Sequence, residues 1–232
     1  GGSASWANIR GVLKDNIKGL HLYEQQDYSS PKIDVWGISD KNLFLESNKV
    51  LRKQEKPFFA IIQTADNHRP YTIPKEDRPY IQMRSFPKDT LVKYGFWTNE
   101  ELNAYAYMDY TYKVFMEAAA KEKYFNNTIF VFVGDHGIRG IAGDMMPKVW
   151  TDQSLTLQHV PMLFYAPGKI QPQVIERKVS QVDIMPTIAG IINKPVTNTT
   201  MGRNIFALPP SSDSDYLNNH AFVLDFERKL FR

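Results

Sequence analysis

Three short apolar segments stand out along the chain, and each one gives way to polar residues, proline or glycine. They cover residues 58–64, 128–133 and 161–166 and are rich in β-branched and aromatic side chains. Continuous apolar runs of this length are typical of strands that are buried on both faces of a parallel sheet. The pattern therefore predicts three strands of a mostly parallel sheet.

A long stretch with helical spacing, residues 99–125, lies between the first two segments. Thr98 or Asn99 suits the N-cap position, and Glu100 and Glu101 follow in the first turn, where the helix dipole favours acidic side chains. Apolar residues recur along the stretch at helical spacing, at Leu102, Ala106, Tyr110, Val114 and Ala118. Strand, helix and strand in this order imply a right-handed crossover between parallel strands, and hence an α/β fold with helices flanking the sheet.

Proline residues mark several of the remaining segments. Residues 70–95 contain Pro70, Pro74, Pro79 and Pro87 and are expected to lack regular structure and to cover the sheet edge where ligands bind in open α/β folds. Residues 180–192 are expected to form a short approach followed by a second helix, with Pro186 in its first turn. Residues 208–215 resemble a linker, and residues 221–226 resemble a late strand in a small antiparallel appendage.

Composition restricts the class of protein further. The chain has 232 residues, of which 43% are hydrophobic, and its 28 basic and 25 acidic residues give a net charge of only +3 at pH 7. Such a chain can bury one substantial core, and a charge excess this small argues against a nucleic-acid partner. Cysteine is absent, which excludes disulfides, thiolate zinc sites and cysteine nucleophiles.

Two further features of the sequence concern membrane insertion and whether the chain is a whole protein. No apolar run approaches the roughly 20 residues that a helix needs to cross a bilayer. The first six residues contain neither an initiator methionine nor a signal-peptide pattern. The chain is therefore expected to be part of a longer protein.

The clearest chemical signal follows the second apolar segment. Asp135 and His136 stand side by side there, flanked by Gly134 and Gly137. A carboxylate and an imidazole can reach one divalent ion if the backbone turns sharply after the strand, which glycine permits. A tight turn in which Asp135 caps the following segment is an equally good interpretation of these residues alone.

A second polar cluster, residues 66–71, occupies the equivalent position after the first apolar segment. It contains His68 and Arg69, and imidazole together with guanidinium suits the oxygens of a phosphate or sulfate. Because the carboxyl ends of parallel strands meet at one edge, the two clusters are expected to converge on one cleft. Taken alone, a residue such as His68 is more often an ordinary loop histidine, and it is Arg69 beside it that favours an anionic substrate.

The remaining histidines carry weaker signals. His159 precedes the third apolar segment, so in a parallel sheet it would lie at the end of the strand remote from the cleft. His21 and His220 have no partner pattern and are expected to lie on the surface. The tyrosines of the long helix, Tyr105, Tyr107, Tyr110 and Tyr112, are interpreted as packing residues.

Several segments carry a resemblance to a known family when they are taken together and in order. They are Gly1-Gly2-Ser3-Ala4-Ser5-Trp6-Ala7-Asn8, Trp36-Gly37-Ile38-Ser39-Asp40, residues 58–64 with Asn67-His68-Arg69-Pro70-Tyr71, Gly134-Asp135-His136-Gly137, His159-Val160-Pro161 with Ala166-Pro167-Gly168, residues 181–187, and Gly202-Arg203-Asn204-Ile205-Phe206. In this order they resemble the landmarks of the lipoteichoic acid synthase, phosphoglycerol transferase and sulfatase group of the alkaline phosphatase superfamily. Residues 1–207 then correspond to a catalytic α/β domain that lacks its N-terminal part, and residues 208–232 to a loop and strand appended to it.

The resemblance assigns roles to individual residues. It implies that Asp135 and His136 bind a catalytic divalent ion, manganese in the first place and magnesium or zinc as alternatives, and that His68 contacts the transferred phosphate. Trp6 falls where the family has a tryptophan in the glycerol phosphate pocket. A family arginine nearby is replaced, with Asn8 at or next to its position. Asp183 and Pro186-Thr187 resemble a structural signature rather than a catalytic one.

The resemblance also implies an activity and a setting. The activity is metal-dependent transfer of a phosphoglycerol-type group from an anionic lipid to a glycan or polymer acceptor, through a covalent phospho-threonine. The threonine, a first metal-binding glutamate and membrane helices would precede Gly1, and the catalytic part would face outward. Two alternatives stay open, a sulfatase or phosphodiesterase acting on sulfate or phosphate esters, and a non-catalytic binding domain.

Overall fold

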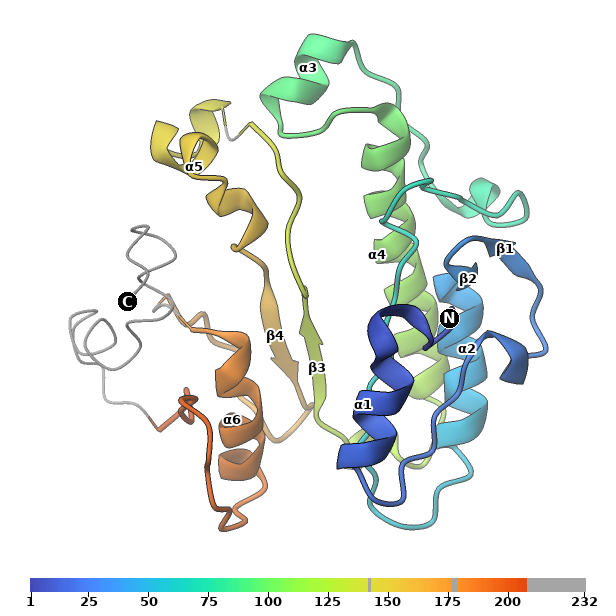
Figure 1. The fold of residues 1–232 in the computed structure, drawn as a ribbon, viewed down its shortest axis with the longest axis vertical. Helices are drawn as coiled ribbons and strands as arrows, with labels where there is room; N and C mark the ends of the chain where they lie inside the picture. Colours follow the sequence, from blue (N-terminus) through green and yellow to red (C-terminus); the bar gives the residue numbers. More distant parts are fainter. Residues whose placement is uncertain (142, 177–178, 208–232) are drawn as a thin grey trace. The chain divides into compact units, whose positions relative to one another are not determined.

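The computed structural model describes residues 1–141, 143–176 and 179–207, which form two compact units (Figure 1). Unit 1 contains Gly1–Thr128 and Gly140–Met145, and unit 2 contains Ile129–Arg139 and the described chain from Met146 onward. The predicted loop and strand at 208–232, and His220 with them, lie outside the described residues. That one domain spans residues 1–207 stays a prediction.

Most of the regular elements in the described residues are helices, and the strands are short. Unit 1 contains α1 (Ile9–Asn16), β1 (Lys32–Asp34), β2 (Gly37–Ile38), α2 (Asp40–Leu51), α3 (Lys88–Lys93), α4 (Asn99–Ala119) and the 3-10 helices η1 (Trp6–Asn8), η2 (Gln25–Asp27), η3 (Arg78–Tyr80), η4 (Phe125–Asn127) and η5 (Gly143–Met145). Unit 2 contains β3 (Phe130–Val133), α5 (Lys148–Asp152), η6 (Leu155–Leu157), β4 (Met162–Tyr165), η7 (Gln181–Asp183) and α6 (Ile184–Ile191).

The long predicted helix is confirmed as α4, but it ends at Ala119, before the predicted end at residue 125. The Thr98 side chain caps it by accepting a hydrogen bond from the backbone N–H of Glu101 at 3.1 Å. The side of α4 that is buried differs from the one predicted, because most buried residues lie one position after the apolar residues named above. The buried residues are Glu101, Asn103, Ala104, Tyr107, Thr111, Phe115 and Ala119. Polar residues belong to this buried side because each has a partner: the Tyr107 hydroxyl, for example, donates to buried Asp77 at 2.8 Å.

Helix α2 packs beside α4 and forms the centre of unit 1 (Figure 1). The rings of Phe44 and Phe115 stack at a centroid distance of 4.7 Å. The Ser39 hydroxyl caps α2 by accepting from the backbone N–H of Asn42. The start of α2 is therefore fixed in the interior of unit 1, which matters for the loop at residues 65–71.

The proline-rich stretch is more regular than expected, because it contains η3 and α3. Two asparagines of α4 hold it along the helix: Asn103 exchanges two hydrogen bonds with the backbone of Arg84, and Asn99 does the same with Phe86. These side-chain amides replace the partner strand that an extended backbone otherwise needs. In unit 1 the stretch therefore packs on a helix.

Unit 2 is built on β3 and β4, which pair antiparallel with Phe130 opposite Tyr165 and Val133 opposite Met162. The parallel arrangement predicted for these two segments is therefore wrong. The first apolar segment, residues 58–64, forms no strand, and Phe59 and Ile61 stay 65% and 78% exposed. A strand requires a neighbour for its ladder of hydrogen bonds, and the described residues supply none to this segment.

Helix α6 is confirmed at Ile184–Ile191, with Pro186 in its first turn. Its start is tied to the chain that follows the helix, because buried Asp183 accepts from the backbone N–H groups of Ser180 and Arg203, both at 2.8 Å. Thr187 adds a bond from the backbone N–H of Ile205 at 3.1 Å. These contacts agree with a structural role for the signature residues Asp183 and Thr187.

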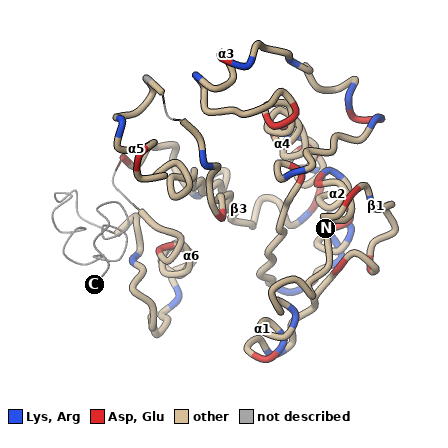
Figure 2. Tube along the Cα trace, turned by 45° about the horizontal axis from the view of Figure 1, so that its top comes forward, with Lys and Arg blue, Asp and Glu red and all other residues tan. Residues whose placement is uncertain are grey.

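The distribution of charged and apolar residues concerns possible nucleic-acid and membrane partners. Basic and acidic residues are interspersed along the trace of each unit (Figure 2). Within the described ranges, no helix combines the length and the apolar character that a membrane span requires.

Candidate functional site

The loop after β3 runs close beside the chain that leads into β4. The backbone N–H of Gly134 donates to Pro161 at 3.3 Å, and that of Gly137 donates to Leu157 at 2.8 Å. A Cβ atom on Gly137 would lie 2.1 Å from the Thr156 carbonyl oxygen. The loop needs glycine here for space, because two stretches of backbone approach each other closely.

Asp135 and His136 project from this loop into solvent, with side chains 78% and 58% exposed. His136 Nδ1 lies 2.7 Å from the carbonyl oxygen of Gly137. Because a carbonyl can only accept, Nδ1 carries the proton and the lone pair of Nε2 is left for another partner. The backbone N–H of His136 donates to Asp135 Oδ1 at 2.8 Å.

The spacing of these two atoms suits a shared ion. His136 Nε2 and Asp135 Oδ2 are 3.9 Å apart. Two ligand atoms that each lie about 2.1 Å from one metal ion can be separated by up to about 4.2 Å. One oxygen and one nitrogen donor with this spacing fit a divalent transition metal such as manganese or zinc.

The pair is part of a site rather than a whole one. In the part of the chain that the structure describes, no group of three or more His, Cys, Asp or Glu side chains could hold a metal ion. A catalytic zinc is held by about three protein ligands. Asp135 and His136 would supply two of such a set.

Gln181 fastens this loop from the other side, a role that the sequence did not reveal. Its side-chain nitrogen donates to the carbonyl oxygen of Gly134 at 2.6 Å and to that of Asp135 at 3.0 Å. The segment containing Gln181 was recognised only as a family landmark. The contact spans more than forty residues of chain, so no local pattern could have indicated it.

The second cluster is anchored at the start of α2. Buried Asp40 accepts from the backbone N–H groups of Ala65 and Asp66, both at 2.9 Å, and donates its own backbone N–H to Asp66 Oδ2 at 2.6 Å. Burial, and then the charge of Asp40, raise the pKa of Asp66 to about 8. Asp66 is thus an anchor of the loop.

His68 and Arg69 are exposed on this anchored loop. Trp36 supports both: its ring lies 4.3 Å from the His68 ring, and its indole N–H donates to the Arg69 carbonyl oxygen at 2.5 Å. Tyr71 donates its hydroxyl to buried Glu101 at 3.0 Å. The loop therefore presents an imidazole and a guanidinium to solvent from a fixed backbone, as binding of an anion requires.

Trp6 and Asn8 lie at the start of unit 1 in η1, and both are exposed, Trp6 by 68%. Asn8 adopts a left-handed backbone, with φ of 57°, directly before α1. The nearby basic residue Arg10 is committed elsewhere, because Glu24 accepts from two of its nitrogens at 2.7 Å each. Arg10 holds the pKa of Glu24 down at about 2, so this ion pair persists at neutral pH.

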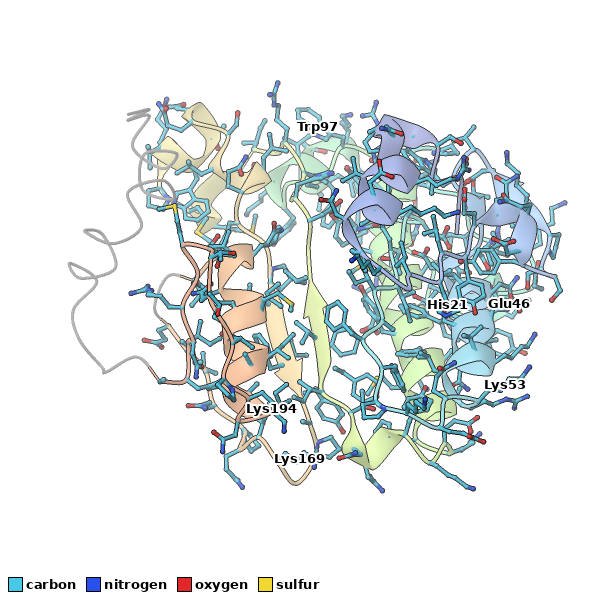
Figure 3. The ribbon with its side chains drawn as sticks, turned by 60° about the horizontal axis from the view of Figure 1, so that its bottom comes forward. His21, Glu46, Lys53, Trp97, Lys169 and Lys194 are labelled. Atoms are coloured by element: carbon cyan, nitrogen blue, oxygen red, sulfur yellow. The ribbon has the colours of Figure 1, made fainter. Side chains whose placement is uncertain are left out.

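The position predicted for His159 requires correction. Because β4 runs antiparallel to β3, the start of β4 lies beside the end of β3, and His159 therefore belongs near the Gly134–Gly137 loop. Its ring meets that of Trp150 edge to face at 5.0 Å. His21 is exposed in the connection after α1, as expected (Figure 3).

The structure describes the two clusters in different units: His68 and Arg69 belong to unit 1, and Asp135 and His136 to unit 2. Each cluster is defined within its own unit. That they converge on one cleft stays a prediction.

Comparison with known proteins gives a consistent result. The family model described as Sulfatase matches residues 2–194. The chain is similar to the lipoteichoic acid synthase-like YvgJ of Bacillus subtilis, with 29% identity over 79% of this chain and 30% of YvgJ. It is also similar to an endo-4-O-sulfatase of Bacteroides thetaiotaomicron, with 26% identity over 71% of this chain and 35% of that protein.

Solved structures share the fold. A protein of the alkaline phosphatase superfamily from Vibrio parahaemolyticus superposes with a TM-score of 0.72 and 25% identity, over 92% of this chain and 48% of its own. The lipoteichoic acid synthase LtaP from Listeria monocytogenes gives 0.70 and 20% identity, over 88% and 51%. The chain spans about a third of the length of the two curated relatives.

Proposed function

The chain belongs to the sulfatase family, and from this premise we propose that it carries part of the active site of a metal-dependent phosphoglycerol-type transferase. The observation that carries the proposal is the Asp135–His136 pair, whose free ligand atoms lie 3.9 Å apart directly after β3. We also propose that, in the full-length protein, this chain contributes to the mostly parallel sheet of an alkaline phosphatase-like fold. The exposed apolar segment at residues 58–64 would be one of its strands.

Asp135 and His136 would hold the metal ion, with manganese expected and magnesium or zinc as alternatives. When bound, such an ion lowers the pKa of a coordinated hydroxyl and screens phosphoryl oxygens. The role of this chain is to hold Asp135 and His136 in place as ligands. The carbonyl oxygen of Gly137 accepts from Nδ1, and this selects the tautomer of the neutral imidazole in which the lone pair of Nε2 is available to the ion.

His68 and Arg69 would bind the phosphoryl oxygens of the substrate. Their exposure and the rigid loop beneath them support this assignment, because a positioned donor loses little entropy when it binds an anion. Trp6 and Asn8 would line the pocket for the alcohol part of the transferred group. With asparagine at this position and Arg10 paired to Glu24, the pocket would be less cationic than one with a free arginine.

The proposed reaction has two steps. A threonine hydroxyl outside this chain attacks the phosphorus of a glycerophospholipid, and the diacylglycerol oxygen leaves with the proton. An acceptor hydroxyl on a glycan or growing polymer then attacks the phospho-threonine and releases the threonine. We place the donor in a membrane, with the catalytic part facing outward and membrane helices elsewhere in the full-length protein.

Ester hydrolysis by a sulfatase or phosphodiesterase is the second candidate, and the similarity to an endo-4-O-sulfatase favours it. In that reaction water takes the place of the acceptor hydroxyl. A binding domain without catalysis is the third candidate. All three would use the same anion-binding loop.

The test is an assay of the full-length protein with manganese, offered either fluorescent phosphatidylglycerol or 4-methylumbelliferyl sulfate. The proposal predicts release of diacylglycerol and mass spectrometric capture of glycerophosphate on a threonine. Turnover of the sulfate ester without lipid turnover would establish the second candidate. Binding without turnover of either substrate would establish the third.

A further inference from the structure

We propose that Gln181 is a positioning residue for the metal-binding loop, an inference that rests on the proposed function of Asp135 and His136. Its side-chain nitrogen has two hydrogens, and both are used, one on the carbonyl oxygen of Gly134 at 2.6 Å and one on that of Asp135 at 3.0 Å. These carbonyls belong to the two peptide groups that flank the Asp135 Cα. Fixing both of them fixes the direction in which the Asp135 side chain leaves the backbone.

The loop has few other restraints at this point. The ladder with β4 ends at Val133 and Met162, and two backbone bonds follow along the loop, from Gly134 to Pro161 at 3.3 Å and from Gly137 to Leu157 at 2.8 Å. Neither of them uses the two carbonyl groups that Gln181 binds. The side chains of Asp135 and His136 are mostly in solvent, so packing does not hold them. The amide of Gln181 therefore supplies the contact that sets the two peptide planes.

Gln181 can do this because its own backbone is fixed. It opens η7, whose last residue, Asp183, is buried and accepts two backbone N–H groups at 2.8 Å each. One of these comes from Arg203, which ties η7 to the chain beyond α6. The restraint on the loop thus leads back to a buried carboxylate in unit 2.

The informative substitution is Gln181→Met, which keeps the length and volume of the side chain, removes the two N–H donors and adds no charge near the metal. Gln173→Met is the matched control, because Gln173 is an exposed glutamine in the same unit. Gln181→Asn keeps the amide on a shorter side chain and should give an intermediate result. Asp135→Ala removes a proposed ligand directly.

The experiment measures Mn²⁺ affinity of the full-length protein by calorimetry, together with thermal unfolding and ¹⁵N NMR of the His136 ring nitrogens without metal. We expect Gln181→Met to weaken Mn²⁺ binding about tenfold, in the range found when groups that orient metal ligands are removed. Gln173→Met should leave the affinity unchanged. The unfolding temperatures of the two methionine variants should agree, and the His136 shifts should move only in Gln181→Met.

The outcomes separate the two proposals. Affinity lost in Asp135→Ala but retained in Gln181→Met would overturn the positioning role and leave the metal site standing. Equal affinity of wild type and Asp135→Ala, or no binding by either, would instead overturn the proposed metal site. In that case the ¹⁵N NMR measurement tests the role of Gln181 without metal. Unchanged His136 chemical shifts in Gln181→Met would overturn the proposal that Gln181 positions the loop.

Discussion

The two polar loops of this molecule are held in opposite ways. The loop at residues 65–71 rests on buried carboxylates, with Asp40 accepting two backbone N–H groups and Asp66 accepting one in return. The Gly134–Gly137 loop rests on close backbone pairing and the single amide of Gln181, and its acidic residue is exposed. Carboxylates thus serve as anchors in one loop, whereas in the other the carboxylate is left available for a ligand.

Among the substitutions, the largest expected effect comes from Asp40→Ala. It leaves two backbone N–H groups without their acceptor in the interior of unit 1, which should lower the free energy of unfolding by about 3 kcal/mol. Asp135→Ala removes an exposed carboxylate and should change it by no more than about 0.5 kcal/mol. Urea unfolding of both variants measures the contrast.

Asp40→Asn is the control, because it keeps one acceptor oxygen and should fall between Asp40→Ala and wild type. Equal costs for Asp40→Ala and Asp135→Ala would break the distinction between anchor and ligand carboxylates.

The next effect is a dependence of stability on pH. Burial and the charge of Asp40 raise the pKa of Asp66 from 3.8 to about 8, so the folded chain favours the protonated form. This contribution to stability is complete below the ordinary pKa of 3.8 and is lost as the pH rises through about 8. The free energy of unfolding should therefore fall across this range, by at most about 1.4 kcal/mol per pH unit.

Asp66→Asn cannot titrate and should flatten the profile. Urea titrations at about pH 5, 7 and 9 measure the slope. A slope of the same size in Asp66→Asn would show that other groups cause it.

The smallest effect is expected for Trp36→Ala, which removes the ring beside His68 and the indole donor to the Arg69 carbonyl. The cost should be about 1 kcal/mol. The NMR signals of the His68 ring should shift, while those of exposed His21 in the same unit stay in place.

Trp36→Phe keeps an aromatic ring but loses the N–H, so it separates stacking from hydrogen bonding. If His68 signals were the same in Trp36→Ala and wild type, Trp36 would not support His68.

Sequence reasoning performed best where the cause was local. The cap at Thr98, the start of α4 and the helix with Pro186 in its first turn follow from neighbouring residues, and the structure has them. The direction of β4 and the lack of a strand at residues 58–64 depend on which segments become neighbours. A run of apolar residues carries no information about that choice.

The site shows the same division. The metal pair and the anion-binding pair were chosen from residue chemistry next to apolar segments. The contacts of Trp36 and Gln181 were not predicted, because each side chain binds residues more than thirty positions away in the sequence. His159 was misplaced because the predicted sheet was parallel.

The central claim is a division of labour in which Asp135 and His136 hold the metal ion while His68 binds the transferred group. The most direct measurement compares metal content and lipid turnover of His136→Ala and His68→Ala in the full-length protein. His136→Ala should lose most of its bound manganese and its turnover. His68→Ala should keep its manganese and lose at least about tenfold in turnover. Full metal content in His136→Ala, or loss of metal in His68→Ala, would contradict the claim.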